Sequence, residues 1–175
     1  SVPLLFGLHG YTSRAIWFLG YSGFQPIADT EKFIVIYPQG SILNTTGQTH
    51  WNVGGWTNGS TTDDVDFISY LIDWSDDNFN INTDRVYSTG MSNGGYMSFL
   101  LACQLSDKIT AIASVTGSMT PQTFSQCNPE RAVPILQIHG TDDQVVPYLG
   151  ASWSESINNV LLYWTSHNNC DPFAT

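Results

Sequence analysis

The segment that decides the fold is Arg85-Val86-Tyr87-Ser88-Thr89-Gly90-Met91-Ser92-Asn93-Gly94-Gly95-Tyr96. Its first five residues predict a strand, and residues 94–105, which are apolar on most sides, predict a buried helix. Between them Gly90, Ser92 and Gly94 form a G-x-S-x-G turn, which projects a serine hydroxyl above a sheet. The glycines suit this tight turn because the neighbouring backbone leaves no space for a Cβ. The segment predicts a nucleophilic Ser92, although the same pattern also occurs in ordinary glycine-rich turns.

Strand and helix patterns alternate on both sides of this turn. Short apolar runs predict four further strands, at residues 4–8, 33–37, 112–115 and 133–138. Apolar residues at helical spacing predict one helix from Val65 to Ile72, after the polar start 61–63, and another from Trp153 to His167. The polar, glycine-rich stretch 41–58 predicts a long surface loop. We expect one α/β domain over residues 1–175, with a mostly parallel sheet buried on both faces by helices.

The composition excludes several classes of partner. The formal net charge is -10, and the five Lys and Arg residues are scattered along the chain. Because no basic patch can neutralise phosphates, nucleic acid and anionic lipid are not expected partners. No apolar run approaches the roughly 20 residues that span a bilayer. Charged residues make up only 11%, which is common in exported proteins.

The three cysteines are Cys103, Cys127 and Cys170. One pair and one leftover is the simplest arrangement, and a Cys103–Cys127 disulfide is our hypothesis. Sequence separation does not determine geometry, so three buried free thiols remain the alternative.

Two loops could complete a site around Ser92. His9-Gly10-Tyr11-Thr12 follows the first strand, where the Tyr11 amide would join the Asn93 amide in an oxyanion hole. His9 itself is expected to hold this loop by hydrogen bonds. The segment 139–148 follows a buried strand downstream of Ser92 and contains the adjacent carboxylates Asp142 and Asp143. One of these carboxylates could orient a catalytic imidazole. The alternative interpretation is that both loops are ordinary turns without a catalytic role.

Other polar and aromatic residues have simpler explanations. Asp63, Asp64 and Asp66 are expected to cap a helix rather than bind a metal. Trp51 and Trp56 could form an aromatic platform for a polymer or aryl ester, or could pack the loop.

Several segments together resemble the polyhydroxybutyrate depolymerase-like and feruloyl esterase-like families of α/β-hydrolases. They are 8–10, 37–40, 63–68, 90–97, 101–103, 139–148 and 164–170, in the family's order. The resemblance implies a secreted carboxylic-ester hydrolase with no cofactor and with Ser92 as nucleophile. The family's His-Gly-Thr-x-Asp pattern places the acid on Asp143 rather than Asp142.

The chain departs from the family at both ends. The family's catalytic histidine follows a further strand, beyond the position of Cys170, whereas this sequence ends at Thr175. It also starts at a central strand, so we expect a sheet without its outer N- and C-terminal strands and an unpaired Cys170. Among the histidines present, His167 alone has the expected chain order for a base, and its place at a helix end favours a structural role.

The resulting prediction is a serine esterase that forms an acyl-enzyme on short-chain, hydroxyalkanoate, feruloyl or acetyl esters. Its expected partner is a small ester, a polyester or a plant-polysaccharide ester. Ser92 would attack, Tyr11 and Asn93 would bind the oxyanion, and Asp143 would orient a histidine from outside this segment. The alternative is a non-catalytic relative that binds an ester or polymer surface without turnover. A third possibility is a dimer or a second chain that completes the sheet and brings the histidine.

Overall fold

The computed structural model describes residues 1–171 and centres on a parallel sheet. The five strands lie in the order β2-β1-β5-β6-β7, and every neighbouring pair is parallel. Their bounds are β1 Val2–Leu8, β2 Ile34–Ile36, β5 Ile81–Met91, β6 Ala111–Val115 and β7 Ile135–Ile138. A separate hairpin pairs β3 (Ile42–Leu43) with β4 (Gln48–Thr49). The expected α/β class with a mostly parallel sheet is confirmed.

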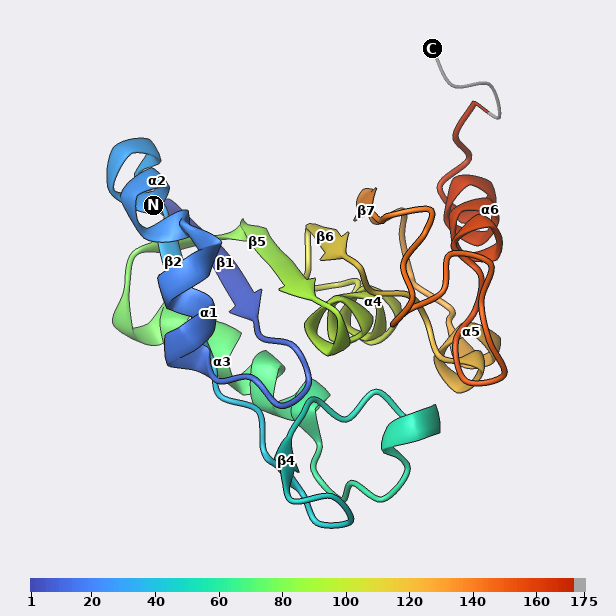
Figure 1. Cartoon of the computed structure of the whole chain (residues 1–175). Helices are drawn as coiled ribbons and strands as arrows, with labels where there is room; N and C mark the ends of the chain where they lie inside the picture. Colours follow the sequence, from blue (N-terminus) through green and yellow to red (C-terminus); the bar gives the residue numbers. More distant parts are fainter. Residues whose placement is uncertain (172–175) are drawn as a thin grey trace.

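Helices connect the strands and pack against part of the sheet. They are α1 Ala15–Ser22, α2 Phe24–Glu31, α3 Asp64–Asn78, α4 Asn93–Gln104, α5 Pro121–Gln126 and α6 Ile157–His167, with a short 3-10 helix η1 at Gly55–Thr57. In Figure 1 the strand arrows point toward one edge of the sheet, from which the loops after β1, β5 and β7 emerge. Because all five strands are parallel, these three loops meet at the carboxyl edge, where α/β sheets bind ligands.

The N-termini of three helices carry side-chain caps. Asp63 accepts a hydrogen bond from the Asp66 amide at the start of α3, as expected for a helix cap. Thr120 caps α5, and Ser156 caps α6 by accepting from the Asn159 amide. The predicted start of the last helix at Trp153 is wrong, because the chain turns at residues 151–154 and the helix begins only after the Ser156 cap.

Three helices, α1, α2 and α5, occur where no helix was expected. Helices α1 and α2 meet at Gly23, which has a φ of 71° and ends one helix while it starts the next. Helix α1 leaves Ile16, Trp17 and Tyr21 exposed, so its apolar residues do not mark one face. Without that periodicity the sequence gives no helix signal. The predicted loop at 41–58 is also partly ordered, since it contains β3, β4 and η1.

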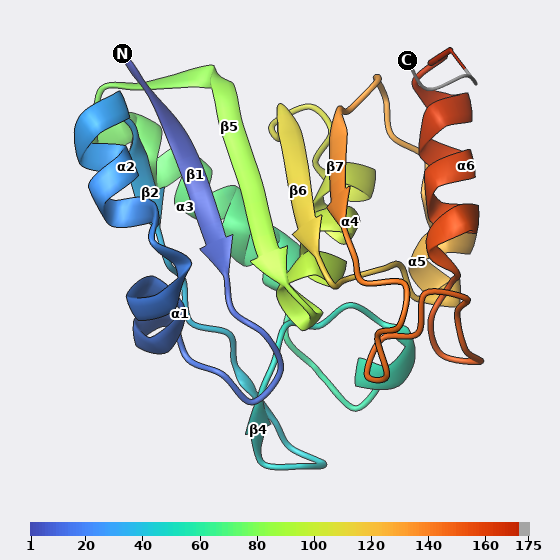
Figure 2. The ribbon, with the colours of Figure 1, turned by 45° about the horizontal axis from the view of Figure 1, so that its top comes forward.

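The sheet is not buried on both faces along its whole width, contrary to expectation. In Figure 2, α3 and α4 lie behind the strands, while the near side of β6 and β7 lies open between α1 and α2 on the left and α6 on the right. Leu136 and Ile138 on β7 are 57% and 52% exposed. The prediction fails here because β7 is an edge strand and no described helix covers this face.

The expected disulfide is confirmed. Cys103, near the end of α4, bonds to Cys127, just after α5, with a Cα–Cα distance of 4.9 Å. Cys170 is free and exposed. Within the described residues, none of the helices is both long and apolar enough to cross a bilayer.

Candidate active site

Ser92 occupies the sharp turn between β5 and α4, as the motif predicts. Its φ of 53° and ψ of -118° lie outside the usual regions for a non-glycine residue. The surrounding structure holds this strained conformation, because the Ser92 amide donates to the Val115 carbonyl at 2.8 Å and its carbonyl accepts from the Tyr96 amide at 3.0 Å. Such strain is typical of functional sites, where it fixes a reactive side chain.

The two motif glycines are required by contact distances. A Cβ on Gly94 would lie 2.1 Å from the Leu8 carbonyl oxygen, and one on Gly90 would lie 2.4 Å from the Gly94 backbone. Helix α4 therefore packs directly on the end of β1. This contact brings the loop after β1 to the serine, since a Cβ on Gly10 would lie 3.7 Å from the Ser92 Cβ.

The amides of Tyr11 and Asn93 border this site. Within residues 1–171, neither backbone N–H donates to a protein acceptor. The Asn93 amide is at the first turn of α4, where the helix dipole favours negative charge. Two free donors beside a serine are the arrangement that an oxyanion would need.

His9 holds the loop after β1, as expected. The ring is fully buried, with Nδ1 2.8 Å from the Gly10 carbonyl oxygen and Nε2 accepting from the Gly40 amide at 3.0 Å. Burial lowers the pKa of His9, and the Gly10 carbonyl bond and the charge of Asp64 only partly oppose that effect. A neutral His9 can thus donate through Nδ1 and accept through Nε2 at once.

The side chain of Asn93 has a role that the motif does not reveal. It is fully buried, accepts from the Trp51 amide at 2.7 Å and donates to the Trp51 carbonyl at 3.1 Å. The Trp51 indole in turn donates to the His9 carbonyl at 2.9 Å. Trp51 is therefore a buried anchor of the loop, which settles the choice between platform and packing for this residue.

The loop after β7 presents Asp143 near the same edge. Its Oδ1 accepts from the amides of Val145 and Val146 at 2.8 and 2.9 Å, and its Oδ2 lies 3.6 Å from His139 Nε2. The Val146 amide bond chiefly lowers the pKa of Asp143, which keeps the carboxylate charged. Asp142 is exposed and accepts from the Gln144 side chain. Of the two carboxylates, Asp143 is the one organised by the backbone.

A cavity of about 360 Å³ joins Ser92 to both loops. It is lined by Tyr11, Trp56, Ser92, Tyr96, Val145, Val146 and Trp153. The ring of Trp56 lies edge-on to those of Tyr11, Tyr96 and Trp153, with centroids 5.7 to 6.5 Å apart. An apolar pocket with few polar groups is typical of small-molecule sites.

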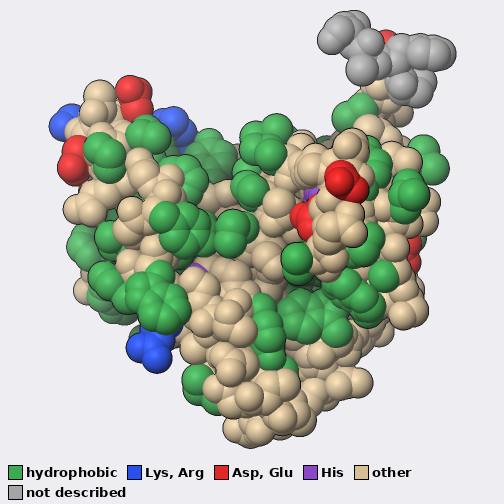
Figure 3. Space-filling view, viewed as in Figure 1, with side chains coloured by type: hydrophobic (Ala, Val, Ile, Leu, Met, Phe, Trp, Pro, Cys, Tyr) green, Lys and Arg blue, Asp and Glu red, His purple; other side chains and the backbone are tan. Residues whose placement is uncertain are grey.

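The aromatic wall of this pocket is fixed by hydrogen bonding and burial. The Tyr96 hydroxyl hydrogen-bonds to Ser154, and burial raises the pKa of Tyr96, so the phenol stays neutral. Figure 3 shows further apolar side chains on this side of the molecule, over α1 and over the segment between β7 and α6. Sequence reasoning missed Tyr96 and Trp153 as pocket residues, since both belonged to stretches read only as helix.

No histidine lines this cavity among the residues that the structure describes. His139 is committed to the Val146 carbonyl and to Gln137, and His50 contacts the Ser41 carbonyl. His167, at the end of α6, lies against the Arg131 carbonyl at 3.2 Å and stacks on Tyr163. The structure thus brings together Ser92, the Tyr11 and Asn93 amides and the Asp143 loop, and it places His167 in a different environment.

Known proteins share this sequence pattern and fold. A bifunctional acetylxylan esterase/xylanase of Neocallimastix patriciarum is 35% identical over 146 residues, which are 83% of this chain and 20% of that protein. Feruloyl esterase D of Neurospora crassa is 33% identical over 128 residues, 73% of this chain and 39% of that protein. The chain therefore spans well under half the length of these relatives.

Structural similarity extends over nearly the whole chain. The crystal structure of the Bacillus cereus carboxylesterase matches with a TM-score of 0.69 at 14% identity, covering 95% of this chain and 75% of that one. This likeness confirms the α/β-hydrolase fold. The sequence model of the family described as Phospholipase/Carboxylesterase matches residues 58–170. The expected resemblance to esterases is thereby confirmed, and the chain belongs to the Phospholipase/Carboxylesterase family.

Proposed function

We propose that this chain carries the nucleophile half of a serine carboxylic-ester hydrolase. The observation that carries the proposal is the strained Ser92 at the mouth of an aromatic pocket, next to the free amides of Tyr11 and Asn93. A serine held this way is the usual attacking group in acyl transfer.

The reaction would begin when Ser92 Oγ attacks the ester carbonyl carbon. The carbonyl oxygen becomes an oxyanion, and the Tyr11 and Asn93 amides would donate to it. Collapse of this intermediate expels the alcohol and leaves an acyl-enzyme, which water hydrolyses to release the acid. Both steps need a base to take the proton from the attacking oxygen.

The base is proposed to come from outside residues 1–171. None of the described histidines lines the Ser92 cavity, and each has its own hydrogen-bond partners. Asp143 is charged and lies in the loop whose Val145 and Val146 line that cavity, so it is available to orient an incoming imidazole. A further segment of polypeptide or a second chain would supply this group.

The substrate is proposed to be an ester with an aromatic or short apolar group. The pocket's lining is almost wholly aromatic or branched aliphatic, which suits a phenolic or short acyl chain rather than a charged one. Feruloyl, acetyl and hydroxyalkanoate esters all remain within this class. We also propose that the protein is secreted, since a disulfide persists in an oxidising compartment.

The test is p-nitrophenyl butyrate hydrolysis by the wild type, Ser92→Ala and Ser166→Ala, with free imidazole added because the proposed base lies outside residues 1–171. Ser166 is an exposed serine on α6 and serves as the matched control. We expect Ser92→Ala to lose the protein-dependent rate and Ser166→Ala to keep it. Equal background rates in all three proteins would reject an esterase role for this chain.

One observation favours a second candidate, a relative that binds esters without turning them over. The Ser92 hydroxyl has no hydrogen-bond partner among the described residues, so no base is in place there to take its proton. In that case an ester analogue would bind at the aromatic pocket with equal affinity in the wild type and Ser92→Ala, and neither would release product.

A further inference from the structure

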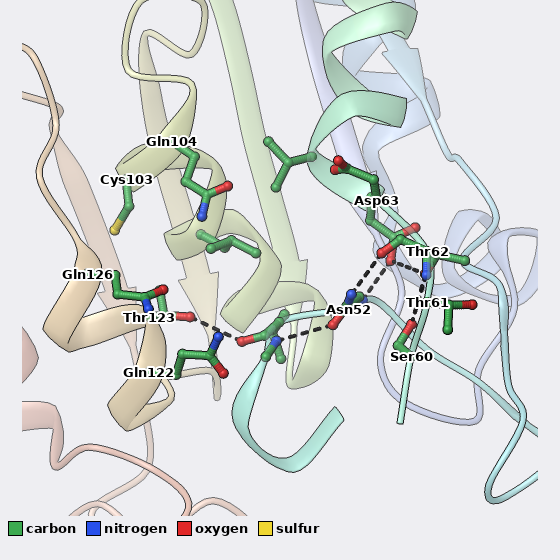
Figure 4. Close-up of a pocket in the computed structure, with 15 residues that line it drawn as sticks. Asn52, Ser60, Thr61, Thr62, Asp63, Cys103, Gln104, Gln122, Thr123 and Gln126 are labelled. Atoms are coloured by element: carbon green, nitrogen blue, oxygen red, sulfur yellow. Dashed lines mark hydrogen bonds between the residues drawn. The ribbon is translucent and has the colours of Figure 1, made fainter. Parts of the chain in front are cut away.

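A second concave site is lined in part by residues 52–54 and 60–65, which flank Trp56 in the sequence. This groove has a volume of about 360 Å³ and is bordered by the N-terminus of α3, the C-terminus of α4 and helix α5. Figure 4 shows Gln104, Gln122 and Gln126 on one side and Thr62 and Asp63 on the other, with Asn52 between them. None of its lining residues borders the Ser92 cavity.

The glutamine side of the groove has unused hydrogen-bonding groups. Within residues 1–171 the side-chain amides of Gln104 and Gln126 make no hydrogen bond, and Gln122 uses only Oε1, which accepts from the Gly55 amide at 2.9 Å. Each free amide offers both donors and an acceptor. The groove can therefore form several hydrogen bonds to a ligand without breaking an internal one.

The disulfide fixes two of these glutamines relative to each other. Gln104 follows Cys103 and Gln126 precedes Cys127, and the two cysteines are bonded. The end of α4 is thus covalently joined to the end of α5 along this wall. The disulfide therefore fixes the backbone positions of Gln104 and Gln126, while their exposed side chains can turn toward a ligand.

The opposite side supplies a buried acceptor. Asp64 is only 5% exposed and lines the groove, and its Oδ2 accepts from the Asn52 amide at 2.6 Å and from the Thr62 hydroxyl. Its Oδ1 has no hydrogen-bond partner in the described part of the chain. This oxygen is not fully buried, so a ligand hydroxyl can replace water as its hydrogen-bond donor.

The lining also limits the chemistry of the ligand. The groove's lining includes no Lys, Arg or His, so phosphate or carboxylate ligands would meet only the repulsion of Asp63 and Asp64. The groove offers side-chain amides, hydroxyls and a carboxylate that only accepts. Sugar hydroxyls suit these groups because each of them can both donate and accept a hydrogen bond. Val53, Val65 and Leu100 offer apolar contact for the C–H faces of a sugar ring.

We propose that this groove binds a neutral saccharide, separately from the Ser92 pocket. A polysaccharide carrying ester groups would then be held at two places, by its sugar chain here and by its ester at Ser92. Binding at the groove does not depend on the esterase proposal, because none of its residues takes part in acyl transfer.

The experiment is a titration with xylotetraose and, separately, cellotetraose, followed by amide chemical shifts in the ¹⁵N-labelled protein. These two neutral oligosaccharides distinguish a pentose from a hexose ligand. We expect at least one of them to shift the amide signals of Gln104, Gln126 and the start of α3. The Gln104→Ala/Gln126→Ala double variant should bind at least about fivefold more weakly, from the loss of ligand hydrogen bonds.

Three controls separate the possible outcomes. Gln25→Ala, an exposed glutamine on α2, should bind as the wild type does. Ser92→Ala should also keep the affinity, and the double glutamine variant should keep the wild-type spectrum elsewhere. No shift in the groove at tens of millimolar sugar, shifts confined to the Ser92 pocket, or full affinity in the double variant would each overturn the proposal.

Discussion

The two sides of the candidate site differ in how they are built. The serine side lies at the centre of the sheet, where α4 packs on β1 so closely that Gly94 has no room for a Cβ. The acid side follows the edge strand β7, with Leu136 and Ile138 exposed and Val145 76% exposed. Ser92 and the two amides proposed to bind the oxyanion are thus held in place by the core, whereas Asp143 depends on a few local hydrogen bonds.

The largest difference between the two sides should appear on adding a methyl group. Gly94→Ala places a Cβ 2.1 Å from the Leu8 carbonyl oxygen, so we expect a loss of at least about 3 kcal/mol in unfolding free energy. On the acid side, the Cβ that Gly140→Ala adds has no atom within 4 Å. This variant should change the unfolding free energy by less than about 0.5 kcal/mol. Urea denaturation of the two variants checks this, and similar losses would mean that both sides are equally packed.

Removing one polar side chain from each side should show a smaller contrast. Asn93→Ala leaves the buried Trp51 amide and carbonyl without partners, which should cost about 2–3 kcal/mol. Asp143→Ala frees two amides that water can reach, and we expect about 1 kcal/mol. Thermal unfolding of both variants measures the difference, and a greater loss in Asp143→Ala would contradict the account.

Acidification should loosen the two sides in different pH ranges. The pKa of His9 is lowered from 6.5, so the fold disfavours its protonation and stability should decline as the pH falls below that value. The pKa of Asp143 is lowered from 3.8, so its contribution is present above that value and is lost only as the pH falls further.

Amide hydrogen exchange between pH 7.5 and pH 3 would resolve this order. Protection at Gly40, which donates to His9, should fall first, and protection at Val145 and Val146 should fall only in the most acidic samples. His9→Gln and Asp143→Asn should each remove one of the two steps. If both loops lose protection together, the two sides are not independent.

The sequence predicted the serine side better than the acid side, for a physical reason. The turn at Ser92 needs particular residues at fixed spacing, so its strand, glycines and helix are visible in order. Which face of β7 is covered depends on distant segments and leaves no local mark. Helix α1 also escaped prediction, because Ile16, Trp17 and Tyr21 are exposed and hide its amphipathic pattern.

Some residues of the candidate site could be recognised only from the structure. Trp153 fitted an apolar helical stripe, but the helix begins only after the Ser156 cap. Trp153 therefore lies in the turn before the helix and lines the Ser92 pocket. The buried side chain of Asn93 matched only a variable position of the motif. Its pairing with Trp51 joins residues 42 positions apart, which no short pattern could indicate.

The most direct test of the central claim is chemical rescue with free imidazole. If Ser92 and its oxyanion donors are in place and only the base is missing, imidazole should raise the rate of p-nitrophenyl butyrate hydrolysis by the wild type. The increase should be larger than the increase that imidazole causes with Ser92→Ala. The difference between the two rates should reach a plateau as the substrate concentration rises. An identical imidazole dependence in both proteins would contradict the claim that Ser92 is a preorganised nucleophile.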